Sequence, residues 1–239
     1  MPPEFEDPYV YPGTQVLRNK PGIRDGYALR QFEYEQTALR IADLREHPVA
    51  GKFDLQHLRD THAQVFQDVY EWAGQIRSIN FSKGGSVFAR TDTIFAEAKR
   101  LHEGLVKENR LHGLEKNQFV ERFAHYFAEW NALHPFREGN GRSTREFFGQ
   151  LAREAGYELD QTRIDNSKDQ WNEAARLSFN GNLAPVKAIF TQAVRPSRAL
   201  AFEKLPEAEA LAKHPELNGA FEYLHALRTA HCRARALPR

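Results

Sequence analysis

The chain has 239 residues, a formal net charge of +1 and 41% hydrophobic residues, a composition typical of soluble globular proteins. The balanced charge gives no electrostatic reason to expect nucleic-acid binding over the whole molecule, and the single cysteine, Cys232, excludes an internal disulfide. The first residues lack the segments of a signal peptide, and no apolar stretch approaches the roughly 18 residues of a membrane span. We therefore expect a cytoplasmic protein without a membrane segment; a C-terminal signal for export by a specialised secretion system stays open.

The N-terminal part of the chain predicts an arm, two helices and a hairpin. Residues 1–25 are rich in Pro, Gly and Tyr, which favours an extended arm. Residues 26–46 contain good helix formers without internal Pro or Gly, and Asp54 is suited to N-cap the next helix. Between residues 75 and 91, a partly alternating pattern around a Gly-Gly pair predicts a short β-hairpin. An exposed hairpin edge can pair with an extended segment of a partner.

The remainder of the chain predicts further helices around one glycine-containing loop. The clearest helix has an apolar stripe at i, i+4, i+7 and i+8, which predicts a central position in the core. Its stripe comprises Phe119, Phe123, Tyr126, Phe127, Trp130 and Leu133. The expected helices cover about residues 92–109, 116–133, 142–155, 168–179 and 183–194. The predicted fold class is all-α, a helical bundle with one small β-hairpin.

A domain boundary is predicted near Arg195-Pro196-Ser197. We expect one domain over residues 1–194 and a helical C-terminal extension over residues 195–239, with a basic end. The extension has no predicted role.

The stretch HPFREGNGRSTR, His134 to Arg145, concentrates residue types suited to phosphate chemistry. Gly139, Asn140 and Gly141 allow a sharp turn that directs successive N–H groups inward where a helix begins. Such N–H groups and the positive end of the helix dipole form an anion site.

Charged side chains follow the same loop. Arg142 and Arg145, three residues apart, project to one side of the helix and suit a polyphosphate. Glu138 is a carboxylate beside a phosphate site, which a bridging Mg²⁺ would explain. His134 can accept a proton near neutral pH. Each residue alone has an ordinary structural interpretation, and only their joint occurrence indicates a site.

This stretch resembles the active-site motif of the Fic family of nucleotidyl transferases, His-Pro-Phe-x-(Asp/Glu)-Gly-Asn-(Gly/Lys)-Arg-x-x-Arg, at every specified position. An opening with YPGT and GIRD, and an EWAGQIR segment before the hairpin, are also similar to the family. The resemblance covers roughly residues 9–194 and implies the Fic fold. It implies an enzyme that transfers AMP from ATP to a Tyr, Thr or Ser hydroxyl of a target protein.

The resemblance also implies individual roles. His134 would be the general base, and Glu138 would hold Mg²⁺ against the phosphates. The backbone of Gly139, Asn140 and Gly141, with the Asn140 side chain, would cradle the phosphates. Arg142 would neutralise charge on the departing pyrophosphate, and Arg145 would bind the γ-phosphate.

Two further segments resemble binding elements of the family. The hairpin is similar to the flap that holds the target segment by strand pairing; its residues are Lys83, Gly84, Gly85, Ser86, Val87 and Phe88. The stretch DQWNEAARLSFNGN is similar to the segment near the adenine. Trp171 and Asn172 are candidates there, and a core residue and a cap are equally good interpretations.

Relatives with other chemistries leave alternatives open. The kinase-like branch has Ala-Asn-Lys where this chain has Gly139-Asn140-Gly141, which favours AMP transfer here. Transfer of UMP or phosphocholine remains an alternative, as does a non-catalytic adaptor, although the presence of His134 and Glu138 argues against the adaptor. A metalloprotein is disfavoured because the sequence has no HExxH or paired Cys/His spacing.

Regulation is a separate question. Many relatives carry an inhibitory helix of pattern (Ser/Thr)-x-x-x-Glu-(Gly/Asn), whose glutamate pairs with the second arginine. Here Thr93 precedes Glu97, but Ala98 follows. We therefore hypothesise that the chain has no built-in brake and resembles the toxin-type class, silenced by a separate small antitoxin whose glutamate would pair with Arg145. That class modifies a tyrosine in the ATPase subunits of bacterial DNA gyrase and topoisomerase IV.

Overall fold

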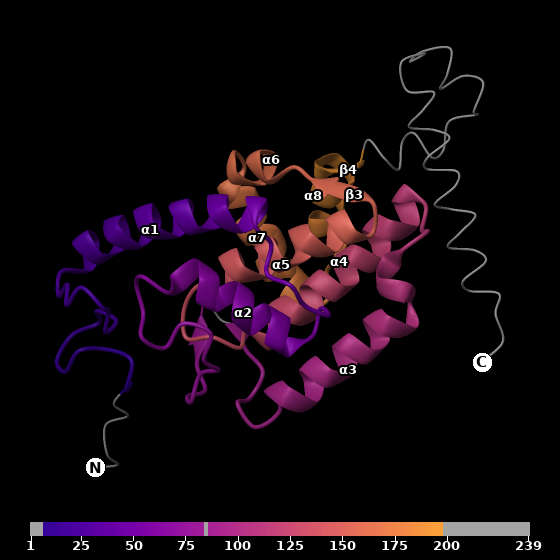
Figure 1. Cartoon of the computed structure of the whole chain (residues 1–239). Helices are drawn as coiled ribbons and strands as arrows, with labels where there is room; N and C mark the ends of the chain where they lie inside the picture. Colours follow the sequence, from indigo (N-terminus) through magenta and orange to yellow (C-terminus); the bar gives the residue numbers. More distant parts are fainter. Residues whose placement is uncertain (1–6, 84–85, 198–239) are drawn as a thin grey trace, which may run out of the picture. The chain divides into compact units, whose positions relative to one another are not determined.

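The computed structural model describes residues 7–83 and 86–197, nearly all of them in the compact unit Met1–Arg195 (Figure 1). The helices are α1 Gly26–Glu46, α2 Leu55–Phe66, α3 Ile94–Lys107, α4 Lys116–Leu133, α5 Asn140–Glu154, α6 Gln161–Asp165, α7 Lys168–Phe179 and α8 Ala184–Ala193, with a 3₁₀ turn η1 at Asn109–Leu111. The strands are β1 Ser82–Lys83, β2 Ser86–Val87, β3 Tyr157–Leu159 and β4 Val194–Pro196. The predicted helical fold with a small antiparallel hairpin is confirmed.

Helix α4 is the centre of the helical core. All six residues of its predicted stripe are buried, and the helix packs against α3, α5, α7 and α8. Phe123 and Phe127 both contact Phe148 of α5 and Phe190 of α8 in edge-to-face geometry. Each such aromatic side chain contributes about 1.5–3 kcal/mol by burial. The C-terminal end of α4 is therefore rigidly placed.

Helix α1 packs on α2, and α2 packs on α5, an arrangement visible in Figure 1. Asp25 and Asp54 cap the two helices by accepting from the backbone N–H groups of Ala28 and His57. Arg45 makes a two-point ion pair with the buried Glu146 of α5, at 3.0 and 2.7 Å. This pair fixes the end of α1 against the helix that follows the motif loop.

The hairpin has the predicted antiparallel pairing, with Ser82 opposite Val87 and Lys83 opposite Ser86. Its strands have two residues each and are shorter than the alternating pattern suggested; most of residues 75–91 lies outside the strands. Gly84 and Gly85 lie outside the described residues.

Four local features differ from the sequence-based expectation. Helix α5 begins at Asn140 rather than Arg142, so Gly141 belongs to its first turn. The small sheet of β3 and β4 and the short helix α6 were not predicted, because segments of three to five residues are too short to show a hydrophobic periodicity. The N-terminal arm folds back on itself, with a bridge between Val10 and Leu17 and a hydrogen bond from Lys20 N to Val69 O.

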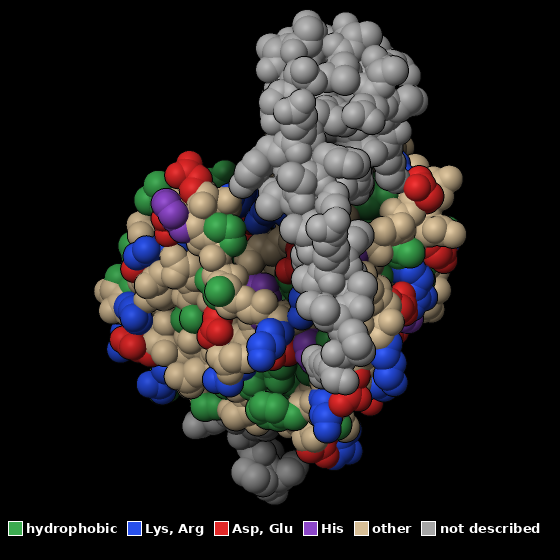
Figure 2. Space-filling view, turned by 45° about the vertical axis from the view of Figure 1, so that its right-hand side comes forward, with side chains coloured by type: hydrophobic (Ala, Val, Ile, Leu, Met, Phe, Trp, Pro, Cys, Tyr) green, Lys and Arg blue, Asp and Glu red, His purple; other side chains and the backbone are tan. Residues whose placement is uncertain are grey.

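The predicted C-terminal extension lies mostly outside the described residues, so its helices and the boundary before it stay predictions. Among the described helices, none combines the length and apolar character needed to cross a membrane. On the uncovered part of the face in Figure 2, acidic and basic side chains are interspersed.

Candidate active site

The motif loop connects two helix ends that both have left-handed backbone. His134 caps the C-terminal end of α4 with φ 45°, and Gly139 precedes α5 with φ 81°. The N-cap of α5 is Gly139, which has no side chain that could cap the helix. The first turn of a helix has backbone N–H groups without intrahelical acceptors, and they attract anions. The loop therefore places His134 six residues before a helix start that is a candidate anion site.

Asn140 closes this loop. Its side-chain Oδ1 accepts from Phe136 N and its Nδ2 donates to Phe136 O, both at 2.8 Å. The residue is 3% exposed. The Asn140 amide therefore shapes the loop from inside, and its backbone N–H belongs to the start of α5; a contact of this side chain with phosphate stays a prediction.

Gly139 is required by space as well as by its backbone angle. A Cβ at this position would lie 2.3 Å from the Phe66 ring of α2. Gly141, by contrast, is exposed, and a Cβ placed there would have no atom within 4 Å. The two glycines of the motif thus differ in what they allow. Gly139 lets the loop pack closely on α2, and Gly141 leaves open space beside the helix start.

His62 of α2 is a buried residue outside the motif, and no pattern in the sequence distinguishes it. Its Nδ1 accepts from Gly74 N at 2.9 Å, so its Nε2 carries the proton and donates to Glu138 O at 3.0 Å. The ring lies 3.9 Å from that of Phe136, centre to centre. Burial is the main cause that lowers the pKa of His62 to about 4. A neutral imidazole therefore holds the Glu138 end of the loop.

The His134 ring is held between aromatic side chains. Phe88, which follows β2, stacks on it at 3.7 Å with an interplanar angle of 9°, and Phe81 contacts it edge-on at 5.8 Å. Nδ1 of His134 lies 3.3 Å from Asn131 O. Because a carbonyl oxygen only accepts, this contact places the proton on Nδ1 and the lone pair of the neutral ring on Nε2.

Arg142 lies beside the helix start and contacts α1. It forms an ion pair with Glu33, donates to Thr37 Oγ1 at 3.1 Å, and lies over the Phe66 ring at 4.7 Å. Tyr70 donates its hydroxyl to the same Glu33 carboxylate. The first arginine of the motif is thus oriented by its own chain, a contact that spacing within the motif could not reveal.

Arg145 also has an acidic partner in its own chain. Its Nη1 donates to Asp165 Oδ1 of α6 at 2.6 Å, and its backbone carbonyl accepts from Gln161. The Arg145 side chain is 15% exposed and that of Asp165 is 53% exposed. The inhibitory pattern of the family contains a glutamate at fixed spacing, so that pattern could not reveal this aspartate. Glu97, the near-match to the pattern, pairs with Arg100 on α3.

Glu138 is half-buried, and its Oε1 accepts from Gly139 N at 3.0 Å. No group of three or more acidic, His or Cys side chains that could hold a metal occurs in the described part of the chain. Mg²⁺ usually takes one or two carboxylates and completes its shell with phosphate and water oxygens, so Glu138 is the candidate ligand in this loop.

The remaining candidates separate into two groups. Phe88 is the flap residue that contacts His134, by ring stacking, and it directly follows strand β2. Trp171 is 7% exposed and packs against Phe127 and Phe190. Its core interpretation is therefore the one that the packing supports.

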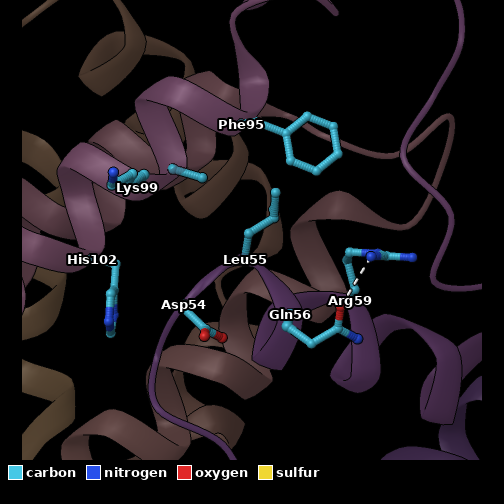
Figure 3. Close-up of a pocket in the computed structure, with 8 residues that line it drawn as sticks. Asp54, Leu55, Gln56, Arg59, Phe95, Lys99 and His102 are labelled. Atoms are coloured by element: carbon cyan, nitrogen blue, oxygen red, sulfur yellow. Dashed lines mark hydrogen bonds between the residues drawn. The ribbon is translucent and has the colours of Figure 1, made fainter.

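A separate pocket of about 330 Å³ lies between the start of α2 and α3 (Figure 3). None of its lining residues belongs to the motif; they include Asp54, Arg59, Phe95, Lys99 and His102. Arg59 is hydrogen bonded to Gln56 and to Gly74 O. The motif loop, rather than this pocket, carries the candidate chemistry.

Comparison with known proteins places the loop in a family. The Fic/DOC family model matches residues 52–152. The chain is 43% identical over 191 residues to "Probable protein adenylyltransferase Fic" of Escherichia coli strain K12, covering 80% of this chain and 94% of that protein. This chain belongs to the Fic/DOC family.

Other relatives of this Fic-family chain agree. Protein adenylyltransferase VbhT of Bartonella schoenbuchensis is 43% identical over 74% of this chain, which corresponds to 36% of that longer protein. The N-terminal Fic domain of a VirB-translocated Bep effector protein from Bartonella quintana, crystallised with bound ADP, has a TM-score of 0.75 and 31% identity. That match covers 81% of this chain and 97% of the solved one. The expectation of a nucleotidyltransferase of the protein adenylyltransferase kind is confirmed by these relatives.

Proposed function

We propose that this chain transfers AMP from ATP to the hydroxyl of a Tyr, Thr or Ser side chain in a target protein. The observation that carries the proposal is the motif loop, which presents an oriented His134, two arginines and a helix start whose N-cap is a glycine. The relatives named as protein adenylyltransferases support it, as does the ADP bound to the Bartonella quintana domain.

His134 is the general base in this proposal. Nε2 accepts the proton of the target hydroxyl while that oxygen attacks the α-phosphorus of ATP. The new O–P bond forms as the bond from the α-phosphorus to the bridging oxygen breaks, and pyrophosphate leaves with that electron pair. Stacking on Phe88 restricts the imidazole to one plane, which lowers the entropic cost of alignment.

The phosphates lie against the start of α5. The backbone N–H groups of Asn140, Gly141 and Arg142 provide donors along the helix dipole, while that of Gly139 donates to Glu138 Oε1. Arg142 and Arg145 stabilise the charge that develops on pyrophosphate. Glu138 would hold Mg²⁺, which neutralises phosphate charge when bound.

The target binds along the hairpin in this proposal, through backbone pairing with an exposed strand edge. Candidate targets are the ATPase subunits of DNA gyrase and topoisomerase IV, which follow from the toxin-type resemblance of the motif. A small antitoxin with an inhibitory glutamate is the corresponding partner. Because Asp165 already pairs with Arg145, such a glutamate would compete with it for the guanidinium.

The test uses the purified full chain with Mg²⁺, ATP labelled at the α-phosphate, and the gyrase and topoisomerase IV ATPase subunits. A bacterial lysate serves as a second source of targets. We expect a labelled protein band that is lost in His134→Ala and does not form with γ-labelled ATP.

Either of two results would contradict the proposal. Label transferred from the γ-position would identify a kinase, and a band that persists in His134→Ala would exclude this base. Absence of any band while the chain still binds ATP would favour another acceptor or donor.

A further inference from the structure

A buried arginine outside the motif joins the hairpin to the loop that carries His134. Arg77 is 2% exposed, and its guanidinium donates to three backbone carbonyl oxygens. Nε donates to His134 O at 2.8 Å, Nη1 to Ile79 O at 2.7 Å, and Nη2 to Ala89 O. Ile79 precedes β1 and Ala89 follows β2, so one side chain contacts both legs of the hairpin and the end of α4.

Backbone hydrogen bonds and ring contacts reinforce this connection. Arg77 N donates to Pro135 O at 2.9 Å, and Ala89 N donates to Ala132 O at 3.2 Å. The guanidinium lies over the Phe81 ring at 5.2 Å, and the same ring contacts His134 edge-on. The legs of the hairpin and the His134 end of the loop are thus held as one assembly.

The side-chain chemistry explains why an arginine suits this position. A guanidinium has five N–H donors in a planar fork, whereas the ammonium of lysine is a point charge that cannot span three separated acceptors. Burial of a charge is costly, and here burial lowers the pKa of Arg77. The burial of a charged side chain at this position indicates that the hairpin requires directional hydrogen bonds, which an apolar side chain does not make.

The opposite end of the loop is held by different residues. His62 binds Glu138 O, and the Asn140 amide closes the loop on Phe136. The nucleotide side of the site therefore does not depend directly on Arg77.

We propose that Arg77 is a positioning residue that sets the distance and register between the target-binding hairpin and His134. It would fix where the target hydroxyl lies relative to Nε2 without contacting nucleotide or target. This inference rests on the proposed function, since it assigns the hairpin to the target.

The test compares Arg77→Lys with Arg90→Lys in the full chain. Arg90 is a matched control, because it lies one residue beyond Ala89, is exposed, and forms its ion pair locally with Asp92. Three quantities are measured: amide hydrogen exchange, the Kd for ATP with Mg²⁺, and the kinetics of AMP transfer to the gyrase and topoisomerase IV ATPase subunits.

We expect amides of residues 78–90 in Arg77→Lys to exchange about tenfold faster or more, while those of residues 138–145 keep their protection. The Kd for ATP stays within about threefold of wild type, and kcat/KM for the protein target falls about tenfold or more, mainly through KM for the target. Arg90→Lys should match wild type in all three measurements.

The inference is overturned if the hairpin amides keep their protection, or if ATP affinity falls as much as transfer does. The exchange and nucleotide measurements decide this even if wild type labels no target, so failure of the proposed function is distinguishable. If Arg77→Lys does not fold, Arg77→Gln replaces it; this variant keeps two N–H donors and buries no charge.

Discussion

At the residue scale, the motif loop depends on groups that lie outside the motif. Only glycine fits at position 139, because the Phe66 ring of α2 occupies the space that a side chain would need. The carbonyl of Glu138 is bound by His62, and that of His134 by Arg77. The motif residues are thus the candidates for the chemistry, and buried neighbours from other elements hold their loop in place.

Gly139→Ala should destabilise the protein strongly. The substitution combines a positive φ with a Cβ 2.3 Å from the Phe66 ring, and strain and overpacking together cost about 2–4 kcal/mol. Urea unfolding at neutral pH measures the change. Gly141→Ala is the control for stability, because that position has open space, and it should change the free energy of unfolding by under about 1 kcal/mol. Equal losses in both variants would refute the role of Phe66.

His62 makes stability dependent on pH in the acid range. Its pKa is lowered from 6.5 to about 4 in the folded state, so the unfolded chain binds the extra proton first. The free energy of unfolding therefore decreases as pH falls from about 6.5 to 4, by up to about 3 kcal/mol. Above pH 6.5 the neutral His62 causes no such loss of stability.

Urea unfolding of wild type and His62→Gln at pH values from 7.5 to 4.5 tests this dependence. The variant lacks the titrating ring, so its stability should fall less steeply with decreasing pH than that of wild type. Parallel pH curves would contradict a neutral buried His62.

At the element scale, three helices determine how the two arginines of the motif are presented. Helix α1 contributes Glu33 to Arg142, and α6 contributes Asp165 to Arg145. Helix α5 is itself fixed by the pair of Arg45 with buried Glu146. Glu146 is buried, so loss of its partner Arg45 is costly, whereas the half-exposed pair of Arg145 contributes little to stability. The Asp165 contact can therefore be exchanged for another anion.

Asp165→Asn should increase the affinity for ATP with Mg²⁺. The carboxylate of Asp165 competes with phosphate for Arg145, and removal of an exposed charge pair of this kind changes the free energy by about 0.2–1 kcal/mol, roughly a 1.5- to 5-fold lower Kd. Isothermal titration calorimetry measures it. Asp169→Asn removes the same charge from α7 and should leave the Kd unchanged. A higher Kd in Asp165→Asn would instead mean that Asp165 helps to orient Arg145 for nucleotide.

At the scale of the whole molecule, the proposed function requires Mg²⁺ together with ATP, and Glu138 is the candidate carboxylate for the metal. A single carboxylate binds Mg²⁺ weakly without the phosphate and water oxygens that complete its shell. The molecule should therefore distinguish Mg²⁺ alone from Mg²⁺ with ATP.

Thermal unfolding provides the measurement. Mg²⁺ alone should leave Tm unchanged, whereas Mg²⁺ with ATP at about 100 times its Kd should stabilise the fold by about 2.7 kcal/mol. Addition of EDTA should remove AMP transfer without lowering the Tm of the protein in the absence of nucleotide. A rise in Tm with Mg²⁺ alone would reveal a preformed metal site.

The sequence by itself determined the fold class, the main helices and the family to which the loop belongs. The bounds of α1, α4 and α7 agree with the predicted ranges, because apolar periodicity, caps and helix breakers are local properties of the chain. The motif was recognisable because its residue types and spacing act within one continuous loop. The predicted roles of its residues remain predictions.

Only the tertiary structure decided what surrounds that loop. The inward-facing amide of Asn140, the acidic partners of both arginines, and the contacts of His62 and Arg77 were not visible in the sequence. Glu33 is 109 residues from Arg142, and Arg77 is 57 residues from His134. Such contacts depend on how α1, α2 and the hairpin pack on α4 and α5, and packing of distant segments leaves no periodic signal in the sequence of either one.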